Sequence, residues 1–477
     1  MIWGIYIVQT NELVELSIAE ASHKIETKEI SPVELTKASF EKIAAVNSKV
    51  SAYLSVFEEE ALEVAKAAEI MIQAGHRLGP LHGIPISLKD NIQMKGFPST
   101  AGSKVLEDWI PSEDATVVKR LKSAGATIIG KTNMHEFAWG GTSDNPHYGT
   151  VRNPWDVKRF PAGSSGGSGV AVAARTCLGS LGTDTGGSVR LPAAINGIVG
   201  IRPTFGRVSN YGVTPLAWSM DTVGPMTRTV EDSAIMLNVM AGHDPYDNSS
   251  SNVSVPDYTN DLNKGIKGLT IGVVPDYFFN NVQEPVLKAY QAALKKLEDL
   301  GARIEEVSIE NIDGNITAQL VVESCEPSTY HQRWLREKPD HYGEDVRLLL
   351  EVGEMHLATH YIQAQRYRHL LRSEFLEAFK MVDVFICPTL PFTATEVGET
   401  TVNINGKEED MLSAIMQFTG VPSLAGLPSL NVPCGFDDNG LPIGMQLIGK
   451  PFDEATLFRV GHSYQQETDF HTKAPNI

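Results

Sequence analysis

The sequence has few cysteines, and they are far apart. Four cysteines occur in 477 residues, at positions 177, 325, 387 and 434, and no two of them form a CxxC pair. This spacing disfavours a disulfide framework and a zinc site, and it is typical of reduced thiols in the cytoplasm. We therefore expect a cytoplasmic protein that needs no metal, and we find no motif that requires another cofactor.

Basic residues are also scarce relative to acidic ones. The chain has 40 Lys and Arg residues against 58 Asp and Glu residues, which gives a formal net charge of −18 at pH 7. Such a charge repels phosphate backbones and anionic lipid head groups, and no run of basic residues compensates for it. The composition therefore predicts neither nucleic acid nor a membrane surface as a partner.

Long hydrophobic runs are absent as well. The apolar stretch Met1–Val8 is far shorter than the roughly 20 residues that cross a bilayer. It also lacks the basic region and the small-residue cleavage site of a signal peptide. Hydrophobic residues make up 42% of the chain, and its 41 Gly and 26 Pro are too few for a low-complexity sequence. We expect a soluble globular protein.

Helix and strand patterns alternate along the chain. Capping boxes at Ser17 and Ser31 begin a helical N-terminal region of about residues 12–75, and a second, mostly helical region covers about 318–380. Further helices are expected at 115–124 and 284–300. Buried strands are expected at 126–129, 269–274, 303–307, 382–387, 429–432 and 443–448. This order predicts a single large α/β/α domain over 1–477, with a mixed, mainly buried β-sheet covered by helices.

Residues 161–190 differ in composition from the rest of the chain. These 30 residues include eight Gly and five Ser but only three charged side chains, Arg175, Asp184 and Arg190. An apolar stretch at 170–174 lies between two glycine clusters, whereas a flexible linker would be polar throughout. We predict a loop, a buried helix, a short strand and a second loop. The glycines indicate that the backbone approaches another group closely at both loops.

Two short motifs match known functional patterns, a phosphate-binding loop and a hydrolase nucleophile elbow. The residues around them disfavour both interpretations. Residues Gly125–Thr132 match the phosphate-loop pattern GxxxxGK[ST], but the β-branched residues Thr127, Ile128 and Ile129 suit a strand, and a helix precedes them. We interpret this segment as a helix-turn-strand unit. Residues Gly163–Gly167 match the GxSxG nucleophile elbow, which would make Ser165 the nucleophile. That elbow should follow an apolar strand, and Pro161 disfavours one.

Three longer motifs, in order, resemble the amidase signature family. They are Gly83–Asn91, which contains Lys89, Gly163–Ser168, which contains Ser164, and Gly182–Arg190, which contains Ser188. The resemblance extends over roughly residues 12–465 and includes flanking motifs at 130–136, 200–206 and 424–429. It implies an amidase signature fold and a Ser–Ser–Lys triad in place of Ser-His-Asp.

The resemblance implies a role for each residue of this triad. Ser188 would attack the amide carbonyl and form an acyl-enzyme, while Ser164 would relay protons between Ser188 and Lys89. A serine hydroxyl is a weak nucleophile unless a neighbouring base removes its proton. Because an amide anion is a poor leaving group, the same relay would protonate the departing nitrogen. A cis peptide bond between Gly163 and Ser164 is also implied.

The resemblance further places an oxyanion hole at the second glycine cluster. The backbone amides of Thr185, Gly186, Gly187 and Ser188 would form it, since two glycines let successive N–H groups point at one spot. We expect Asp184 and Arg190 to pair and shape this loop, and Ser165 to make hydrogen bonds within its own loop. His82 and His135, which lie near the motifs, are expected to be structural.

Two kinds of amidase are compatible with these motifs. One is a free-standing hydrolase of small carboxylic amides, for which a homodimer is a plausible assembly. The other is the A subunit of a glutamine-dependent aminoacyl-tRNA amidotransferase, which characteristically has Gln where this chain has Leu191. That leucine, together with the apolar stretch 411–421, favours the free-standing amidase. The acyl pocket is expected in the regions 315–370 and 410–425, and the sequence does not identify the amide.

Overall fold

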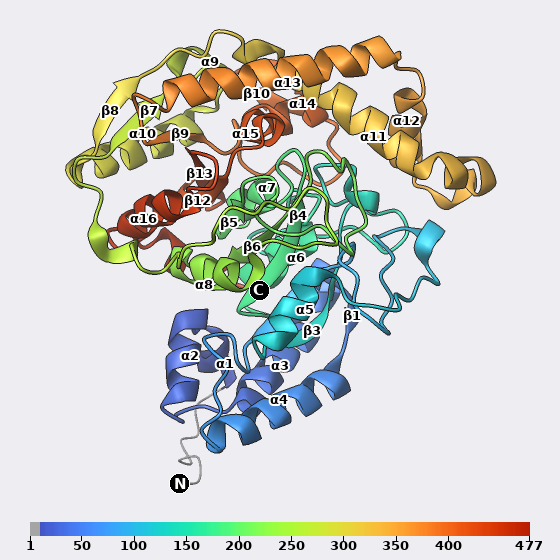
Figure 1. The fold of residues 1–477 in the computed structure, drawn as a ribbon, viewed down its shortest axis with the longest axis vertical. Helices are drawn as coiled ribbons and strands as arrows, with labels where there is room; N and C mark the ends of the chain where they lie inside the picture. The colour runs from blue at the N-terminus through green and yellow to red at the C-terminus, as the bar shows by residue number, and fades with distance from the viewer. Residues whose placement is uncertain (1–9) are drawn as a thin grey trace.

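Residues 10–477 are described by a computed structural model, so the N-terminal stretch Met1–Val8 lies outside the described residues. Eleven strands form one sheet in the order β1-β3-β2-β4-β6-β5-β12-β13-β9-β7-β8, and helices pack around it (Figure 1). Parallel pairs lie toward both ends of the sheet, while β4, β6, β5, β12, β13 and β9 are joined by antiparallel pairs. The predicted α/β class with a mixed, helix-covered sheet is confirmed.

The strands follow the chain in this order: β1 (Tyr53–Val56), β2 (Pro85–Lys89), β3 (Thr127–Thr132), β4 (Gly179–Asp184), β5 (Val199–Arg202), β6 (Thr222–Thr227), β7 (Thr270–Val273), β8 (Arg303–Glu306), β9 (Val384–Pro388), β12 (Ser429–Phe436) and β13 (Pro442–Gly449). A separate hairpin consists of β10 (Thr401–Ile404) and β11 (Lys407–Asp410). The predicted strands are therefore present, within a few residues at their ends. The short β5, β6 and the hairpin were not predicted.

The principal helices are α1 (Thr10–Val14), α2 (Ile18–Glu26), α3 (Pro32–Val50), α4 (Glu58–Gln73), α5 (Thr116–Ser123), α6 (Gly166–Ala173), α7 (Arg190–Ile195), α8 (Val230–Met240), α9 (Pro275–Phe278), α10 (Glu284–Asp299), α11 (Asn315–Glu337), α12 (Glu344–Gly353), α13 (Ala358–Ala378), α14 (Met411–Met416), α15 (Gly420–Ala425) and α16 (Glu454–Gln465). The predicted helical region 318–380 corresponds to α11, α12 and α13. These three helices lie at the opposite end of the molecule from α1–α4 (Figure 1).

The N-terminal helices begin where the capping boxes predict. The Ser17 hydroxyl accepts a hydrogen bond from the Glu20 amide at 3.1 Å, and the Glu20 carboxylate accepts one from the Ser17 amide at 2.8 Å. The same reciprocal pair, with Ser31 and Glu34, begins α3. The prediction that residues 12–75 are all helical is wrong at β1, however. Tyr53, Ser55 and Val56 pair antiparallel with β3, so tertiary pairing overrides the helical surroundings.

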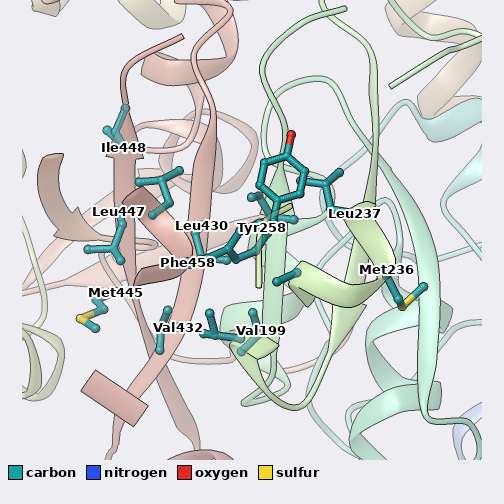
Figure 2. Close-up of a cluster of buried hydrophobic side chains, with 14 of the residues drawn as sticks. Val199, Met236, Leu237, Tyr258, Leu430, Val432, Met445, Leu447, Ile448 and Phe458 are labelled. Carbon is teal, nitrogen blue, oxygen red and sulfur yellow. The ribbon is translucent and has the colours of Figure 1, made fainter. Parts of the chain in front are cut away.

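The centre of the sheet is covered by an apolar layer. Leu430, Val432 and Leu447 of β12 and β13 lie near Val199 of β5 and Phe458 of α16 (Figure 2). Their side chains are excluded from water, and each stabilises the fold by about 1.5–3 kcal/mol relative to an exposed position. This packing holds β5, β12 and β13 together beside the glycine-rich segment.

The glycine-rich segment folds as predicted into a loop, the buried helix α6, the strand β4 and a second loop. Every residue of α6 is buried. Its glycines allow close approach of backbone: a Cβ on Gly167 would lie 2.6 Å from the Ala52 carbonyl oxygen. The helix therefore fixes the loop that precedes it, residues 163–165, against the sheet.

The segment that matches the phosphate-loop pattern is a strand, as its β-branched residues predict. It follows α5 and forms β3, in which Lys131 is fully buried. The Lys131 ammonium lies 3.2 Å from an Asp90 carboxylate oxygen and 2.9 Å from the Ser99 hydroxyl. Lys131, the lysine of this motif, therefore forms an ion pair inside the protein.

Two remaining expectations concern thiols and membranes. All four cysteines are free, and Cys177, Cys387 and Cys434 are buried. Within residues 10–477 no helix combines the length and the apolar composition that crossing a bilayer requires.

Candidate active site

The ammonium group of Lys89 lies at the carboxyl end of β2, in the interior of the protein. Its Nζ donates to the Ser164 hydroxyl at 2.7 Å and to the Thr183 hydroxyl at 2.8 Å. The Asn91 amide also donates to the Thr183 hydroxyl, at 3.1 Å. Every residue of β2 is buried, and the strand places the Lys89 amine where it is inaccessible to solvent.

Burial changes the proton affinity of Lys89. Desolvation lowers the pKa of its amine from 10.5 to about 7, although the carboxylates of Asp184 and Asp221 act in the opposite direction. Near neutral pH a large share of the Lys89 amines is therefore uncharged. An uncharged amine beside a serine hydroxyl can accept a proton, which an ordinary lysine cannot do at that pH.

Ser164 and Ser165 belong to the loop before α6. The peptide bond between Gly163 and Ser164 is cis, as the resemblance implies. The Ser165 hydroxyl donates to the Thr183 carbonyl at 3.1 Å and accepts from the Thr183 amide at 3.2 Å. Ser165 is thus engaged within the fold and does not follow an apolar strand, which disfavours the nucleophile-elbow interpretation.

Ser188 lies on the second glycine loop, next to the first. The Ser165 amide donates to the Ser188 carbonyl at 3.2 Å, so the two loops are joined at the predicted triad. Ser188 is 8% exposed, whereas Lys89 and Ser164 are fully buried. Among the residues that the structure describes, no hydrogen bond links the hydroxyls of Ser164 and Ser188, and none uses the backbone N–H of Gly186, Gly187 or Ser188. These N–H groups are available to a ligand.

The conformation of this loop requires glycine at position 187. Gly187 has φ of +143°, and a Cβ there would lie 2.8 Å from the Cβ of Thr419. The Thr419 hydroxyl in turn donates to the Gly186 carbonyl at 2.7 Å. This bond ties the Gly186 carbonyl to α15's N-cap residue and leaves the N–H groups at 186–188 without a partner in the described residues.

A buried ion pair holds both ends of the Ser188 loop. The Arg190 guanidinium binds the Asp184 carboxylate through two hydrogen bonds of 3.0 and 2.9 Å, and Arg202 adds a third of 3.0 Å. All three side chains are inaccessible to solvent. Burial alone would raise the pKa of Asp184, but the two guanidinium groups hold it well below its usual range. The expected pairing of Asp184 with Arg190 is present.

Asp221 supports the first residue of the predicted oxyanion hole, and nothing in the sequence indicated it. The Thr185 hydroxyl donates to its carboxylate at 2.6 Å, and the amides of Leu216 and Ala217 donate at 2.9 and 3.1 Å. Burial raises the pKa of Asp221 to about 6 despite these bonds. No motif connects residues 185 and 221, so only the tertiary structure could reveal this contact.

The side chains of His82 and His135, the two histidines near the motifs, make their hydrogen bonds away from the predicted triad. The His82 ring accepts a hydrogen bond from the Leu78 amide at 3.1 Å, and burial lowers its pKa. The His135 ring lies 2.9 Å from a carboxylate oxygen of Asp345. Neither contact involves the predicted triad, which agrees with a structural role for both.

A small pocket of about 10 Å³ lies beside Ser188, and its lining is mainly apolar. Besides Ser188 and Gly186 its wall includes Trp139, Leu191, Leu216, Leu412, Met416 and Glu323. Leu412, Met416 and Glu323 come from the two regions predicted to contain the acyl pocket, whereas Trp139 and Leu216 come from loops that were not predicted. None of the described residues that line this pocket is basic.

Curated relatives resemble the chain over its full length. It is 42% identical to a protein from Carboxydothermus hydrogenoformans that is named as the A subunit of glutamyl-tRNA(Gln) amidotransferase, covering 98% of this chain and 100% of that one. A solved structure of the protein of that name from Thermotoga maritima is 33% identical, with a TM-score of 0.79 and coverage of 98% and 97% of the two chains. A solved chain from a vestigial protein complex, linked to the origins of an s-triazine catabolic enzyme, is also 33% identical. Its TM-score is 0.91, and the match covers 95% of this chain and 98% of that one.

These relatives correct one expectation and leave another without support. The expectation of a small amide as partner, with no nucleic acid and with a homodimer as the assembly, is not upheld. The relatives are named as components of an enzyme that is itself named after a tRNA. Net charge misled here, because it describes the whole surface of one chain and says nothing of what a larger assembly binds. The preference for a free-standing amidase over such a component is likewise not supported.

The family assignment rests on most of the chain. The family model described as amidase matches residues 34–458, a span that includes Lys89, Ser164, Ser188 and the full central sheet. The chain belongs to the amidase family.

Proposed function

We propose that this protein hydrolyses a carboxylic amide through an acyl-enzyme on Ser188. The observation that supports it most is the buried Lys89 amine, 2.7 Å from the Ser164 hydroxyl, at the junction of the two glycine loops. Such a pair supplies the base that a serine nucleophile requires. Among the described residues, no histidine side chain is hydrogen-bonded to Lys89, Ser164 or Ser188, and His135 contacts Ser164 only through its backbone N–H.

In the proposed reaction Lys89 accepts the Ser164 proton while Ser164 accepts the proton of Ser188. The Ser188 oxygen bonds to the amide carbon, and the carbonyl oxygen becomes an oxyanion held by the backbone N–H groups of residues 185–188. The relay then delivers a proton to the amide nitrogen as the C–N bond breaks and ammonia or an amine departs. Water, deprotonated by the same relay, hydrolyses the ester on Ser188 and restores the enzyme.

Within this class we propose that the chain acts as the A subunit of an amidotransferase, releasing ammonia for use by its partner subunits. Full-length similarity to proteins of that name supports this proposal, because it extends over 97–98% of the chain and 99–100% of the relatives. The ammonia donor of such a complex would be the side-chain amide of glutamine.

One observation favours a second candidate, hydrolysis of a more apolar amide without partner subunits. Leu191, Leu412 and Met416 line the pocket, and no basic residue among its described lining would neutralise the α-carboxylate of glutamine. A buried carboxylate without a counter-charge is strongly disfavoured.

Ammonia release by the purified chain separates the two candidates. L-glutamine and butanamide are tested in turn, with and without the other amidotransferase subunits and glutamyl-tRNA(Gln). The amidotransferase proposal predicts glutamine hydrolysis that rises at least tenfold in the complete mixture. Butanamide hydrolysis by the chain alone, with glutamine inert in every mixture, would favour the second candidate.

The pH dependence of the reaction should reflect the neutral form of Lys89. Its pKa is about 7 in the folded protein, so protonation below that pH removes the base. We expect kcat/KM for a normal amide to rise about tenfold per pH unit below pH 7 and to level off above it. The measurement is a pH–rate profile of the wild-type protein from pH 5 to 9, and a flat profile between 5 and 8 would contradict the base role.

Gly187→Ala should disable the proposed oxyanion hole. The added methyl would collide with the Thr419 side chain, and φ of +143° disfavours any side chain there. We expect kcat to fall by about 10²–10³, the typical loss when an oxyanion donor is removed. Gly398→Ala is the control, because Gly398 also has positive φ but is exposed and has open space around it. Unchanged kcat in Gly187→Ala would exclude this loop from the reaction.

A further inference from the structure

One face of helix α11 presents a row of unpartnered polar atoms. Asn315, Gln319 and Glu323 are spaced four residues apart, so their side chains lie on the same side of the helix. All three are buried, at 0%, 0% and 1% exposure, and each leaves one oxygen without a hydrogen bond: Asn315 Oδ1, Gln319 Oε1 and Glu323 Oε2. A buried polar atom without a hydrogen bond destabilises the fold, so three such acceptors in a row are suited to N–H donors of a bound molecule.

Glu323 is the member of this row that reaches the pocket beside Ser188. A Cβ built on Gly186 would lie 2.7 Å from Glu323 Oε1 and would collide with the Gln319 amide. The carboxyl group therefore lies against the Ser188 loop. The Gln319 amide nitrogen donates to Oε1 at 3.0 Å, which leaves Oε2 as the open acceptor.

Among the described residues, no basic side chain forms an ion pair with the Glu323 carboxyl group, although Arg202 is close enough to affect its pKa. Arg190 and Arg202 are both bound to Asp184, and the described lining of the pocket has no basic residue. Burial, together with the nearby Asp221 and Asp184 carboxylates, raises the pKa of Glu323 to about 8, although the Gln319 hydrogen bond and the Arg202 charge act in the opposite direction. A cation that enters the pocket would lower the pKa of Glu323, because an opposite charge favours the ionised carboxylate.

We propose that Glu323 is a specificity-determining residue of the acyl pocket and that it accepts a hydrogen bond from an ammonium group on the acyl chain of the amide substrate. The open Oε2 atom and the acceptor oxygens of Gln319 and Asn315 are all suited to N–H donors. An ion pair with a desolvated carboxylate gives a charge-assisted hydrogen bond that an uncharged amide lacks. This inference rests on the proposed function in one respect, which is that the acyl chain of the substrate lies beside Ser188.

Binding to the Ser188→Ala variant tests the proposal without turnover. The probes are butanamide and its 2-, 3- and 4-amino derivatives, titrated by calorimetry at pH 7.5. At least one amino derivative should bind at least tenfold more tightly than butanamide. The double variant Ser188→Ala/Glu323→Gln, which keeps the shape of the side chain, should lose that preference and bind butanamide within threefold of the single variant.

Glu326→Gln is the matched control on the same helix. Glu326 is already paired with the Ser219 and Tyr361 hydroxyls, at 2.6 and 2.7 Å, and does not line this pocket. Its variant should keep the preference for the amino derivative. Equal binding of all four probes would overturn the proposal. So would a Glu323→Gln effect that is equal for butanamide and its amino derivatives, since that indicates a structural role.

The two proposals fail in different ways. If the wild-type protein hydrolyses no amide and forms no acyl-enzyme, the proposed function is wrong, while the binding preference still decides the role of Glu323. If amides are hydrolysed but the preference is absent, only the role of Glu323 is wrong. Should Glu323→Gln fail to fold, Glu323→Ala in the Ser188→Ala background, judged by its melting temperature, replaces it with the same expectations.

Discussion

Lys89→Arg is expected to lower amide turnover as strongly as Lys89→Ala, by roughly two to four orders of magnitude. Arginine keeps a positive charge but does not deprotonate at any working pH, so it cannot accept the Ser164 proton. The amine of Lys89, by contrast, has a pKa near 7 because it is buried. The measurement is kcat for a normal amide in both variants, with circular dichroism to verify that they fold.

An activated ester distinguishes the proton transfer to the leaving group from the proton transfer that activates Ser188. Its leaving group departs without a proton, so the loss in both Lys89 variants should be smaller for the ester than for the amide. Lys89→Met, which is uncharged and close to lysine in length, is the control for side-chain volume and should behave as Lys89→Ala does. Near-native amide turnover in Lys89→Arg would exclude a base role and reopen a histidine mechanism.

Asp184→Asn should cost about 3–5 kcal/mol of unfolding free energy, because it leaves two buried guanidinium groups without their carboxylate. Arg190 and Arg202 are both inaccessible to solvent and both bind Asp184. The Asp184 carboxylate also accepts the Val189 amide at 3.1 Å, so the Ser188 loop should lose its fixed position and activity should fall too. Urea denaturation of the wild type and the variant gives the difference in stability.

Glu63→Gln provides the matching surface control. Glu63 pairs with Lys66 at 2.6 Å, but both side chains are more than half exposed, and such pairs contribute at most about 1 kcal/mol. The variant should unfold within about 1 kcal/mol of the wild type. An Asp184→Asn variant that is no less stable than Glu63→Gln would show that the buried cluster does not hold the loop.

The positions of the candidate site could be predicted because its residues lie in local motifs. Glycine clusters at 163–169 and 182–187 mark the two loops, and the apolar run before Lys89 marks a buried strand. What joins them is not local. Thr183 and Asn91 lie within the motifs, but only the fold brings them to Lys89 and to each other, and Asp221 lies outside every motif.

Glu323 shows why acyl-pocket residues escape sequence analysis. A glutamate in an amphipathic helix ordinarily lies on the solvated face, and only the packing of α11 against the Ser188 loop makes this one buried. Strand β1 was missed for a related reason. Its four residues lie between two helices, and the pairing with β3 that defines it is 70 or more residues away in the chain. The burial of Glu323 and the formation of β1 both depend on contacts between segments that are far apart in the sequence.

Covalent labelling tests the central claim most directly. The protein is treated with a phosphonylating reagent, digested with trypsin and mapped by mass spectrometry. Ser164 and Ser165 lie in the tryptic peptide 160–175, and Ser188 lies in the peptide 176–190, so the two interpretations give labels on different fragments. We predict that the label is on Ser188, that Ser188→Ala abolishes it, and that peptide 160–175 stays unmodified. A label on Ser165 would contradict the proposed mechanism and support the nucleophile-elbow alternative.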